Sequence, residues 1–469
     1  MSSTPASDPE VTAGMRVVVI GASLAGLFAA AAAAANGAEV VILERDRLPD
    51  TPEPRKGVPQ SRQAHVLLHR GLLSAEQLLP GLREDLIASG AAVFDSGAMP
   101  WLGEYGWLPT WWPGLELVSA TRPLLEHLAR QRLLSQSAVT VHEGARASGL
   151  RRAGQQWQVA TEDGRTFVAD RVIDASGRSS RLPLWLGELG VRVPEAEQID
   201  AHLGYACRLY RANGPPPLET GVLIAGTPTT GRGAIALPVE NAHWLVIEGG
   251  YGHHRPTREP EEFEAYLAGL RDPAVADVAA RLEPVSDIAL YRQTSNRRHR
   301  FGRIRGWPEG LLVVGDAACA FNPVYGQGIT VAAQQALLIR DRWQARRLQQ
   351  GLDGVADFCW TVASGEDLRH PTSDGRQNLG QRVLARWSME LGHQAVAGEH
   401  RAYRTFLLAY NLMARPLVLF HPALFVSAVR AAVRGRGAPA PRPEVLERLR
   451  EARAGEDPVN PASVKAQPA

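Results

Sequence analysis

The chain has 469 residues, of which 45% are hydrophobic and 21% charged, a composition typical of a globular protein with more than one core. Its formal net charge of +2 argues against nucleic acid as the main partner. The three cysteines, Cys207, Cys319 and Cys359, lie far apart, which excludes a disulfide framework or a zinc motif and predicts a cytoplasmic protein without a metal.

The first expected unit consists of an apolar strand at 15–20, an alanine-rich helix at 24–35 and a second apolar strand at 39–43. Two strands joined by a helix in this way pair in parallel, because a parallel pair needs a crossover connection. The helix is too short to span a bilayer, so we expect it to be buried. The unit predicts the start of a dinucleotide-binding fold.

The turn between the first strand and the helix carries Gly21, Ser23 and Gly26 in the pattern GxSxxG. Gly21 permits the tight turn, and Gly26 permits close packing of the helix on the strand. Ser23 replaces the glycine that normally faces the pyrophosphate, and its hydroxyl is suited to donate to a phosphate. Glu44, followed by Arg45 at the end of the second strand, is suited to bind an adenosine ribose hydroxyl.

The middle of the chain alternates helical and strand-like patterns. Residues 63–90 have helical apolar spacing, residues 95–118 are loop-like and rich in aromatic side chains, and a helix is expected at 122–135. The aromatic segment 99–113, together with the antiparallel strands expected within 202–250, is a candidate wall for a large apolar substrate, although core packing of a loop explains the segment equally well. The short alternating segments that predict a small antiparallel insertion are 138–142, 155–161 and 165–169.

A second motif, with Asp174, Ser176 and Gly177, follows a buried strand at 171–174. Taken alone, it is best explained as a simple loop. The elements expected after it are antiparallel strands at 202–211, 221–226, 233–238 and 243–250, a helical stretch at 259–282 and a long strand at 284–294.

A third motif combines the end of a strand at 310–314, the pair Gly315-Asp316 and a glycine-rich turn before a helix that begins near 329. Backbone N–H groups at such a helix N-terminus bind an anion or an electron-rich ring. The Asp316 carboxylate is suited to accept hydrogen bonds from sugar hydroxyls, and proline makes the turn rigid. The turn contains Pro323, Gly326, Gln327 and Gly328.

The C-terminal region is expected to be helical from about 340 until a proline-rich, flexible tail after 436. Residues 401–436 contain six arginines and no acidic residue, and most of 406–429 is apolar. A buried helical pair is the favoured explanation, and contact with a membrane surface or a lid over an apolar tunnel are the alternatives. Pro416 and Pro422 argue against a spanning helix.

The three motifs, in this order and spacing, resemble those of group A flavoprotein monooxygenases, which have the para-hydroxybenzoate hydroxylase fold. The resemblance covers about residues 15–345, and Ser176 stands where the family usually has an aspartate, which leaves open how the flavin is reduced. Residues 55–65, residues 307–310 and the FNPVYGQG sequence further resemble the olefin epoxidases of polyether antibiotic biosynthesis.

The resemblance implies an α/β fold with a discontinuous Rossmann-like FAD-binding domain, an antiparallel-sheet substrate domain and a helical C-terminal extension. We expect the FAD-binding domain at 14–75, 119–182 and 285–345, the substrate domain at 76–118 and 183–284, the helical region at 346–455 and a flexible tail at 456–469.

The resemblance also implies a set of cofactor contacts. The flavin-edge turn would act through Pro323, Gly326 and Gly328, and no side-chain acid or base is assigned. The residues expected to bind FAD are Gly21, Ser23, Gly26, Glu44, Arg45, Arg62, Arg122, Asp174, Gly177, Gly315, Asp316, Gly326, Gln327 and Gly328.

The implied reaction is FAD reduction, addition of O₂ to give a flavin C4a-hydroperoxide, and epoxidation of an alkene in a large apolar polyketide or isoprenoid-like product. Aromatic hydroxylation, reduction of isoprenoid double bonds and flavin binding without catalysis remain alternatives. NADPH, NADH or a separate flavin reductase would supply the electrons, since no second dinucleotide-binding motif is visible.

Overall fold

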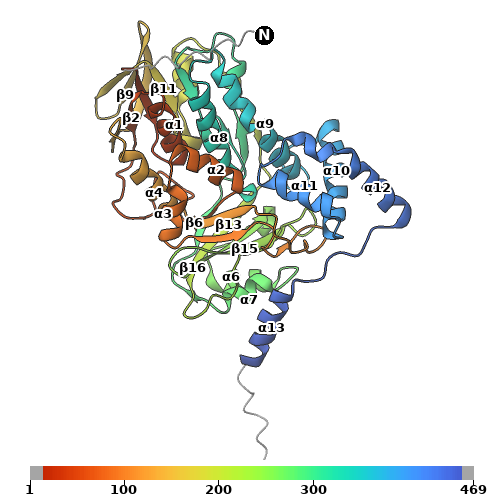
Figure 1. Cartoon of the computed structure of the whole chain (residues 1–469). Coiled ribbons are helices and arrows are strands. Elements are labelled where there is room, and N and C mark those ends of the chain that lie inside the picture. Colours follow the sequence, from red (N-terminus) through yellow and green to blue (C-terminus); the bar gives the residue numbers. More distant parts are fainter. Residues whose placement is uncertain (1–13, 457–469) are drawn as a thin grey trace, which may run out of the picture.

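The computed structural model describes residues 14–456 and contains a five-stranded parallel sheet in the order β20-β11-β1-β2-β7 (Figure 1). Its strands are β1 (Arg16–Ile20), β2 (Glu39–Leu43), β7 (Val139–His142), β11 (Arg171–Asp174) and β20 (Leu311–Val313). Neighbouring residues of β1 point to opposite faces, and Val17 and Val18 are both buried. Burial on both faces is typical of a parallel sheet that is covered on each side.

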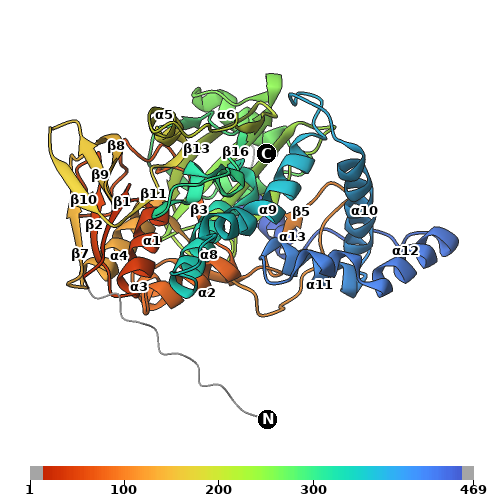
Figure 2. The ribbon, with the colours of Figure 1, turned by 90° about the horizontal axis from the view of Figure 1, so that it is seen from above.

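Helices cover one face of this sheet, and a small antiparallel sheet covers the other (Figures 1 and 2). The helices include α1 (Leu24–Ala34), α4 (Arg122–Leu134) and α8 (Gly328–Asp341). The small sheet consists of β8 (Ala147–Ala153), β9 (Gln156–Thr161) and β10 (Thr166–Ala169). The buried alanines of α1 belong to the same core cluster as Ala333 and Ala336 of α8, and their small side chains let the two helices pack closely.

A seven-stranded, mostly antiparallel sheet forms the second large unit. Its strands are β5 (Trp101–Leu102), β13 (Leu203–Arg211), β14 (Val222–Ile224), β15 (Arg232–Pro238), β16 (His243–Tyr251), β17 (Glu283–Pro284) and β18 (Ala289–Tyr291). One face packs against α6 (Pro260–Ala268) and α7 (Ala274–Ala279). On the other face, Tyr205 reaches the third motif by donating to Asn322 Oδ1 over 3.1 Å.

Four helices after α8 form a lobe beside this sheet, in teal to blue in Figure 1. They are α9 (Leu348–Asp367), α10 (Leu379–Val396), α11 (His400–Tyr410) and α12 (Pro422–Arg434). Together, the parallel sheet, the antiparallel sheet and these helices confirm the predicted fold class, an α/β fold with a Rossmann-like part, an antiparallel-sheet part and a helical C-terminal extension.

The predicted antiparallel insertion is wrong in its first segment, because β7 pairs in parallel with β2 in the main sheet. The connection between these two strands includes α4, which supplies the crossover that parallel pairing needs. The helical prediction for 63–90 is also wrong at its start, where β3 (Ala64–Leu67) pairs with β6 (Glu116–Thr121). Only then do α2 (His69–Leu78) and α3 (Leu82–Ala88) follow. A four-residue strand is too short to show a period of two.

Three further predictions need correction. The loop-like segment 95–118 contains β5 and the start of β6, and the long strand expected at 284–294 is replaced by the short β17 and β18. The tail after 436 is not irregular throughout, since α13 (Glu444–Glu456) buries Leu446 and Leu449 in the core below the antiparallel sheet. The flexible tail predicted at 456–469 lies outside the described residues except for its first residue.

The buried helical pair predicted for 406–429 is half correct. Helix α11 buries Tyr403 and Leu407, whereas Leu424 alone is buried in α12. Within the described residues, the segment 416–434 is the one stretch long and apolar enough to cross a membrane by length and composition, and 6% of it is buried. Most of the apolar side chains of α12 are therefore not buried inside the protein.

Candidate active site

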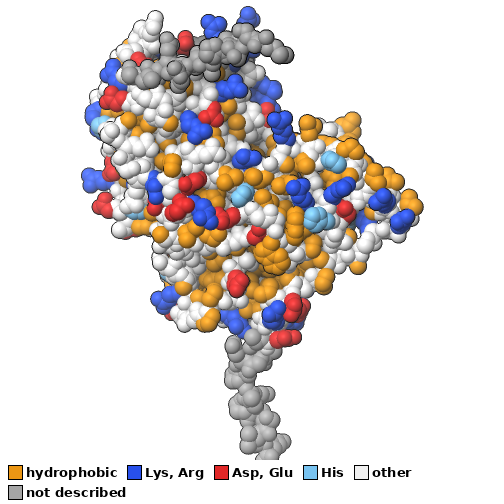
Figure 3. All heavy atoms as spheres, viewed as in Figure 1, with side chains coloured by type: hydrophobic (Ala, Val, Ile, Leu, Met, Phe, Trp, Pro, Cys, Tyr) orange, Lys and Arg blue, Asp and Glu red, His pale blue; other side chains and the backbone are white. Residues whose placement is uncertain are grey.

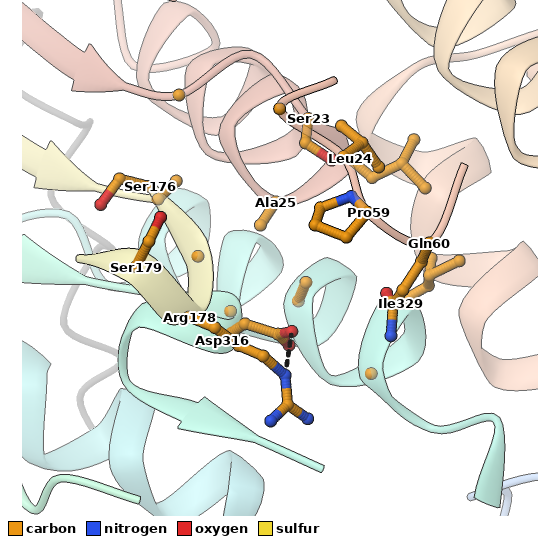
Figure 4. A pocket seen from close by; sticks show the side chains of 18 of the residues that line it. Ser23, Leu24, Ala25, Pro59, Gln60, Ser176, Arg178, Ser179, Asp316 and Ile329 are labelled. Atoms are coloured by element: carbon orange, nitrogen blue, oxygen red, sulfur yellow. Dashed lines mark ion pairs between the residues drawn. The ribbon is translucent and has the colours of Figure 1, made fainter. Parts of the chain in front are cut away.

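The three sequence motifs meet around one cavity of about 440 Å³, a size typical of small-molecule sites. The βα turn after β1, the loop after β11 and the turn before α8 all line it. Figure 4 shows Ser23 from the first motif, Ser176 and Ser179 from the second and Asp316 from the third around the same space. Segments that lie about 300 residues apart in the sequence thus form a single site.

Most of the predicted site residues line this cavity. Those that do are Gly21, Ser23, Glu44, Arg45, Arg122, Gly177, Gly315, Asp316, Pro323, Gly326, Gln327 and Gly328. Gly26, Arg62 and Asp174 do not, since Gly26 and Asp174 lie behind the cavity wall and Arg62 is exposed beside a neighbouring hollow.

The glycines of the first motif are required by close backbone contacts. Gly21 has φ +103°, and a Cβ at this position would lie 2.7 Å from the carbonyl oxygen of Ala175. A Cβ on Gly26 would collide with the carbonyl oxygen of Gly21. These contacts agree with the predicted roles of Gly21 in the tight turn and Gly26 in helix–strand packing.

The hydroxyl of Ser23 takes part in a hydrogen-bond network. Ser23 donates to Glu126 Oε1 over 2.6 Å and accepts from Arg122 Nη2 over 2.7 Å. Arg55 Nη2 also donates to Glu126 Oε2 over 2.7 Å. The Ser23 proton is held by Glu126 in this structure, and its donation to a phosphate stays a prediction.

Glu126 is the centre of this buried network. Burial alone would raise the pKa of its carboxyl, but the charges of Arg122 and Arg55 outweigh that effect and lower the pKa to about 2. Arg122 donates from Nε to Glu126 Oε1 over 2.7 Å, at the helical i, i+4 spacing. The network fixes Arg122 at the cavity wall, where the sequence predicted a flavin-side contact.

Glu44 lies at the cavity end of β2, as the sequence predicted. Its Oε2 accepts from the backbone N–H of Ala22 over 2.8 Å, and its Oε1 accepts from Asp46 N over 2.9 Å. Arg55 Nη1 lies 3.3 Å from Glu44 Oε2. The carboxylate is held rigidly at the cavity wall, and its binding of a ribose hydroxyl stays a prediction.

The second motif is organised around Asp174, which is completely buried. Burial raises the pKa of its carboxyl, while hydrogen bonds from Ser176 and Ser180 act in the opposite direction. Ser176 donates to Asp174 Oδ1 from both its backbone N–H over 2.9 Å and its hydroxyl over 2.6 Å. Asp174 thus positions the loop that carries Ser176 and Gly177 into the cavity wall and does not itself face the cavity.

Arg178 joins the second motif to the third. Its Nε lies 3.6 Å from Asp316 Oδ2, the ion pair drawn in Figure 4. Its two terminal nitrogens donate to the carbonyl oxygens of Ser295 over 2.7 Å and of Phe321 over 2.6 Å. This fixed guanidinium holds the Asp316 side chain at the cavity.

The turn before α8 is held from behind by Asp367, a residue that the sequence analysis missed. Tyr325 Oη donates to Asp367 Oδ1 over 2.7 Å, Asn322 Nδ2 donates to it over 3.1 Å, and Asn296 Nδ2 donates to Oδ2 over 2.6 Å. Burial raises the pKa of Asp367 to about 7, although these hydrogen bonds oppose the shift. Asp367 ends α9, and no local motif links it to the turn.

The described residues fit FAD. The buried Oε1 of Gln327, a residue of the cavity wall, has no hydrogen-bond partner among the described residues, as expected for an atom that meets a bound polar group. Gly177 has φ +76° and no atom within 4 Å of an added Cβ. The opening at Gly177 and the unpaired Gln327 oxygen lie on a cavity whose motifs match those of an FAD site.

Aromatic side chains of the C-terminal lobe approach the turn from the other side. A Cβ on Gly326 would lie 4.0 Å from Tyr410 Oη. The ring of Trp101 lies edge-on to Tyr410 at 5.0 Å and to Phe406 at 5.2 Å between centroids. Trp101 belongs to the segment predicted as a substrate wall, so this segment lies beside the turn.

The histidine that lines the cavity is a weak base. Burial, followed by the charge of Arg122, lowers the pKa of His65 to about 3, and its Nδ1 lies 2.9 Å from the carbonyl oxygen of Gln63. Within residues 14–456, no group of three His, Cys, Asp or Glu side chains is arranged to hold a metal ion.

The fold and the cavity define a class of flavoproteins with the para-hydroxybenzoate hydroxylase fold. The chain belongs to the family described as FAD binding domain, whose model matches residues 14–342. It is an FAD-dependent monooxygenase of the group A type, since relatives of this family are named as monooxygenases or hydroxylases.

Two curated relatives and one solved structure illustrate the similarity. Protein Rv3254 of Mycobacterium tuberculosis is 30% identical over 357 residues, which cover 73% of this chain and 75% of that protein. The 6-methylpretetramide 4-monooxygenase of Streptomyces rimosus is 26% identical and covers 68% of this chain and 73% of its own length. PqsL of Pseudomonas aeruginosa has the same fold, with a TM-score of 0.57, 18% identity and coverage of 76% of this chain and 94% of that chain.

Proposed function

We propose that this monooxygenase epoxidises an alkene in a large apolar natural product of polyketide or isoprenoid type. The observation that carries the proposal is the aromatic cluster of Trp101, Phe406 and Tyr410, which packs beside the turn at Gly326 and would form a wall for the substrate. Such a wall suits an extended apolar molecule. Epoxidation needs no base, and His65, with a pKa of about 3, is a poor one.

Bound FAD would supply the activation of O₂, which no protein side chain performs. In the overall reaction, one oxygen atom adds across the C=C bond, the other leaves as water, and the reductant gives two electrons. The backbone of Gly326, Gln327 and Gly328 at the start of α8 would stabilise negative charge at the cofactor edge. Pro323 and the Asp367 hydrogen bonds would hold that turn in place.

We propose that a nicotinamide cofactor docks in the hollow next to the FAD cavity. The hollow, of about 610 Å³, shares Val58, Pro59 and Gln63 with that cavity. The basic residues around it are Arg55, Lys56, Arg62, Arg208 and Arg258, against a single acid, Asp287. This excess of positive charge suits the phosphates of NADPH or NADH, and it gives exposed Arg62 a role at the reductant.

The double variant K56A/R258A tests this docking. Loss of two exposed phosphate contacts should raise the KM for NADPH about tenfold with little change in kcat. Arg151→Ala, which removes an exposed arginine of β8, serves as the control. An unchanged KM, or oxidation that begins only after a flavin reductase is added, would contradict the proposal.

Aromatic hydroxylation is the second candidate, favoured by the relative named 6-methylpretetramide 4-monooxygenase. The FAD-loaded protein should therefore be incubated with NADPH, ¹⁸O₂ and a panel of long-chain polyenes and polycyclic phenols. An ¹⁸O-labelled epoxide from a polyene would support our proposal. An ¹⁸O-labelled phenol as the sole product would support hydroxylation, and product formed equally well under nitrogen would indicate a double-bond reductase.

A further inference from the structure

Helix α12 presents an apolar face to solvent. Val429 is 63% and Val433 is 80% exposed, and Phe425 and Val426 lie on the same side at i, i+3 and i+4 spacing. Leu424, on the opposite side, is 1% exposed and belongs to the core of the lobe. One side of this helix is anchored, and on the other side Val429 and Val433 are exposed to solvent.

The lobe around this face is strongly basic. Residues 375–436, which we call the C-terminal cap, contain nine arginines and two glutamates, a surplus of seven positive charges. The whole chain has 51 basic and 49 acidic residues, so the remainder of the protein carries a surplus of five negative charges. The charge of this protein is therefore concentrated at one end, where Figure 3 shows arginines among hydrophobic side chains.

The two acids of the cap are already used inside it. Glu390 accepts from Arg436 Nη2 over 2.6 Å, and Glu399 accepts from the backbone N–H of Ala402 over 2.7 Å at the start of α11. Arg430 and Arg434 are exposed one turn apart along one edge of the apolar face of α12. An apolar face bordered by arginines is the pattern of helices that lie in the interface of an anionic bilayer.

The apolar segment 416–434 is broken into a 3-10 turn and α12, and α12 alone is too short to span a bilayer. Helix α12 has 13 residues, about 20 Å at 1.5 Å per residue, against a hydrocarbon core of about 30 Å. The preceding 3-10 turn at Pro416–Phe420 and Pro422 at the start of α12 interrupt the apolar segment. The short length and the positive charge of α12 are both compatible with a helix that lies flat on the surface of the bilayer.

We propose that the C-terminal cap docks this protein on the surface of an anionic lipid bilayer through α12. Phe425, Val426, Val429 and Val433 enter the interface, and Arg430 and Arg434 pair with anionic head groups. Phe425 stacks on Trp387 with ring centroids 4.2 Å apart, which couples the docked face to the core of the cap. The inference does not depend on the substrate.

Flotation of the FAD-loaded full chain with vesicles tests the proposal. The vesicles contain phosphatidylcholine with 40% phosphatidylglycerol, or phosphatidylcholine alone. We expect binding to the anionic vesicles that weakens at least tenfold with neutral vesicles or at high salt. The double variant V429E/V433E should lose at least tenfold in affinity for anionic vesicles, because it places two carboxylates on the docking face.

Leu184→Glu is the matched control, since Leu184 is also an exposed aliphatic residue, at 62%, on α5 (Leu182–Glu188), away from the cap (Figure 2). It should bind vesicles like the unchanged protein. The flavin spectrum verifies that each variant is folded. Failure of the unchanged protein to bind anionic vesicles would overturn the proposal, as would a dimer that V429E/V433E dissociates in the absence of any vesicle binding.

Discussion

Two buried carboxyl groups, one in the nucleotide-binding part and one in the antiparallel sheet, have opposite surroundings. Glu126 is 5% exposed and contacts Arg55, Arg122 and Ser23. Glu248 on β16 is 0% exposed, and neither of its oxygens has a hydrogen-bond partner among the described residues. Burial alone raises the pKa of both groups, yet the pKa is about 2 for Glu126 and about 9 for Glu248.

The difference shows how the two parts use polar groups. In the nucleotide-binding part, the charges form a connected network that fixes Arg122 at the cofactor cavity. In the sheet, burial dominates the pKa of Glu248, and the charge of Arg232 lowers it only in part. At neutral pH the first carboxyl is therefore ionised and the second is protonated.

The largest effect is expected when the paired carboxylate, Glu126, is removed. Glu126→Ala leaves buried Arg122 without its carboxylate partner and Arg55 with Glu44 and Asp46 alone, which should lower the free energy of unfolding by about 3–5 kcal/mol. Its contribution is present above the ordinary pKa of 4.5 and is lost as the pH falls toward 2. Urea unfolding between pH 3 and 8 measures this dependence.

The control for this variant is Glu162→Ala, which removes an ion pair with Arg146 in which both side chains are about half exposed. Exposed pairs of this kind contribute about 0–1 kcal/mol. Equal losses of stability in the two variants would show that the buried network has no special role.

Glu248→Gln tests the unpaired side and should stabilise the protein by about 1–3 kcal/mol at neutral pH. Because the folded pKa of about 9 exceeds the ordinary 4.5, the folded state binds more protons between these values. The stability of the unchanged protein therefore falls as the pH rises from about 4.5 to 9. Thermal unfolding at pH 5, 7 and 9 should show a gain that grows with pH, and destabilisation at every pH would contradict this.

Asp367 is a third buried carboxyl group, which accepts hydrogen bonds and still has a pKa of about 7. Asp367→Asn tests its role. Weaker hydrogen bonds to Tyr325 and Asn322 should loosen the turn before α8 and slow NADPH oxidation about tenfold. The unchanged enzyme should also show a step near pH 7 in its pH profile that the variant lacks. The same step in the variant would assign that titration to another group.

The smallest expected effect is that of Ser176→Ala, which removes one hydroxyl donor from buried Asp174. We expect a loss of about 1 kcal/mol in stability and retained FAD binding, since the backbone N–H of residue 176 still donates. Ser176→Asp, which restores the usual residue of the family, should be worse, because it places a second carboxylate beside Asp174. Thermal unfolding and FAD titration of both variants compare these outcomes.

The nucleotide-binding part could be predicted from the sequence because its motifs are local. The contacts of Gly21 and Gly26 follow from a turn of six residues, and Asp316 follows directly from the end of a strand. Asp367 could not be predicted, because it meets Asn322 across 45 residues and through a helix that has no motif of its own. The use of the Ser23 hydroxyl likewise depends on Glu126, 103 residues away.

The buried helical pair predicted at 406–429 is only half correct for a related reason. The apolar periodicity of 406–429 predicts a face to be covered, but it does not say whether protein or another phase covers it. Helix α11 meets protein at Tyr403 and Leu407, and α12 does not meet it at Val429 and Val433. Only the tertiary structure separates these two cases.

The most direct test of the central claim follows NADPH oxidation by the purified protein under air and under nitrogen, together with its visible spectrum. The account predicts a bound flavin, continued turnover with peroxide or oxygenated product under air, and no turnover beyond reduction of the flavin under nitrogen. A colourless protein that does not take up added FAD, or turnover that proceeds equally well without O₂, would contradict it.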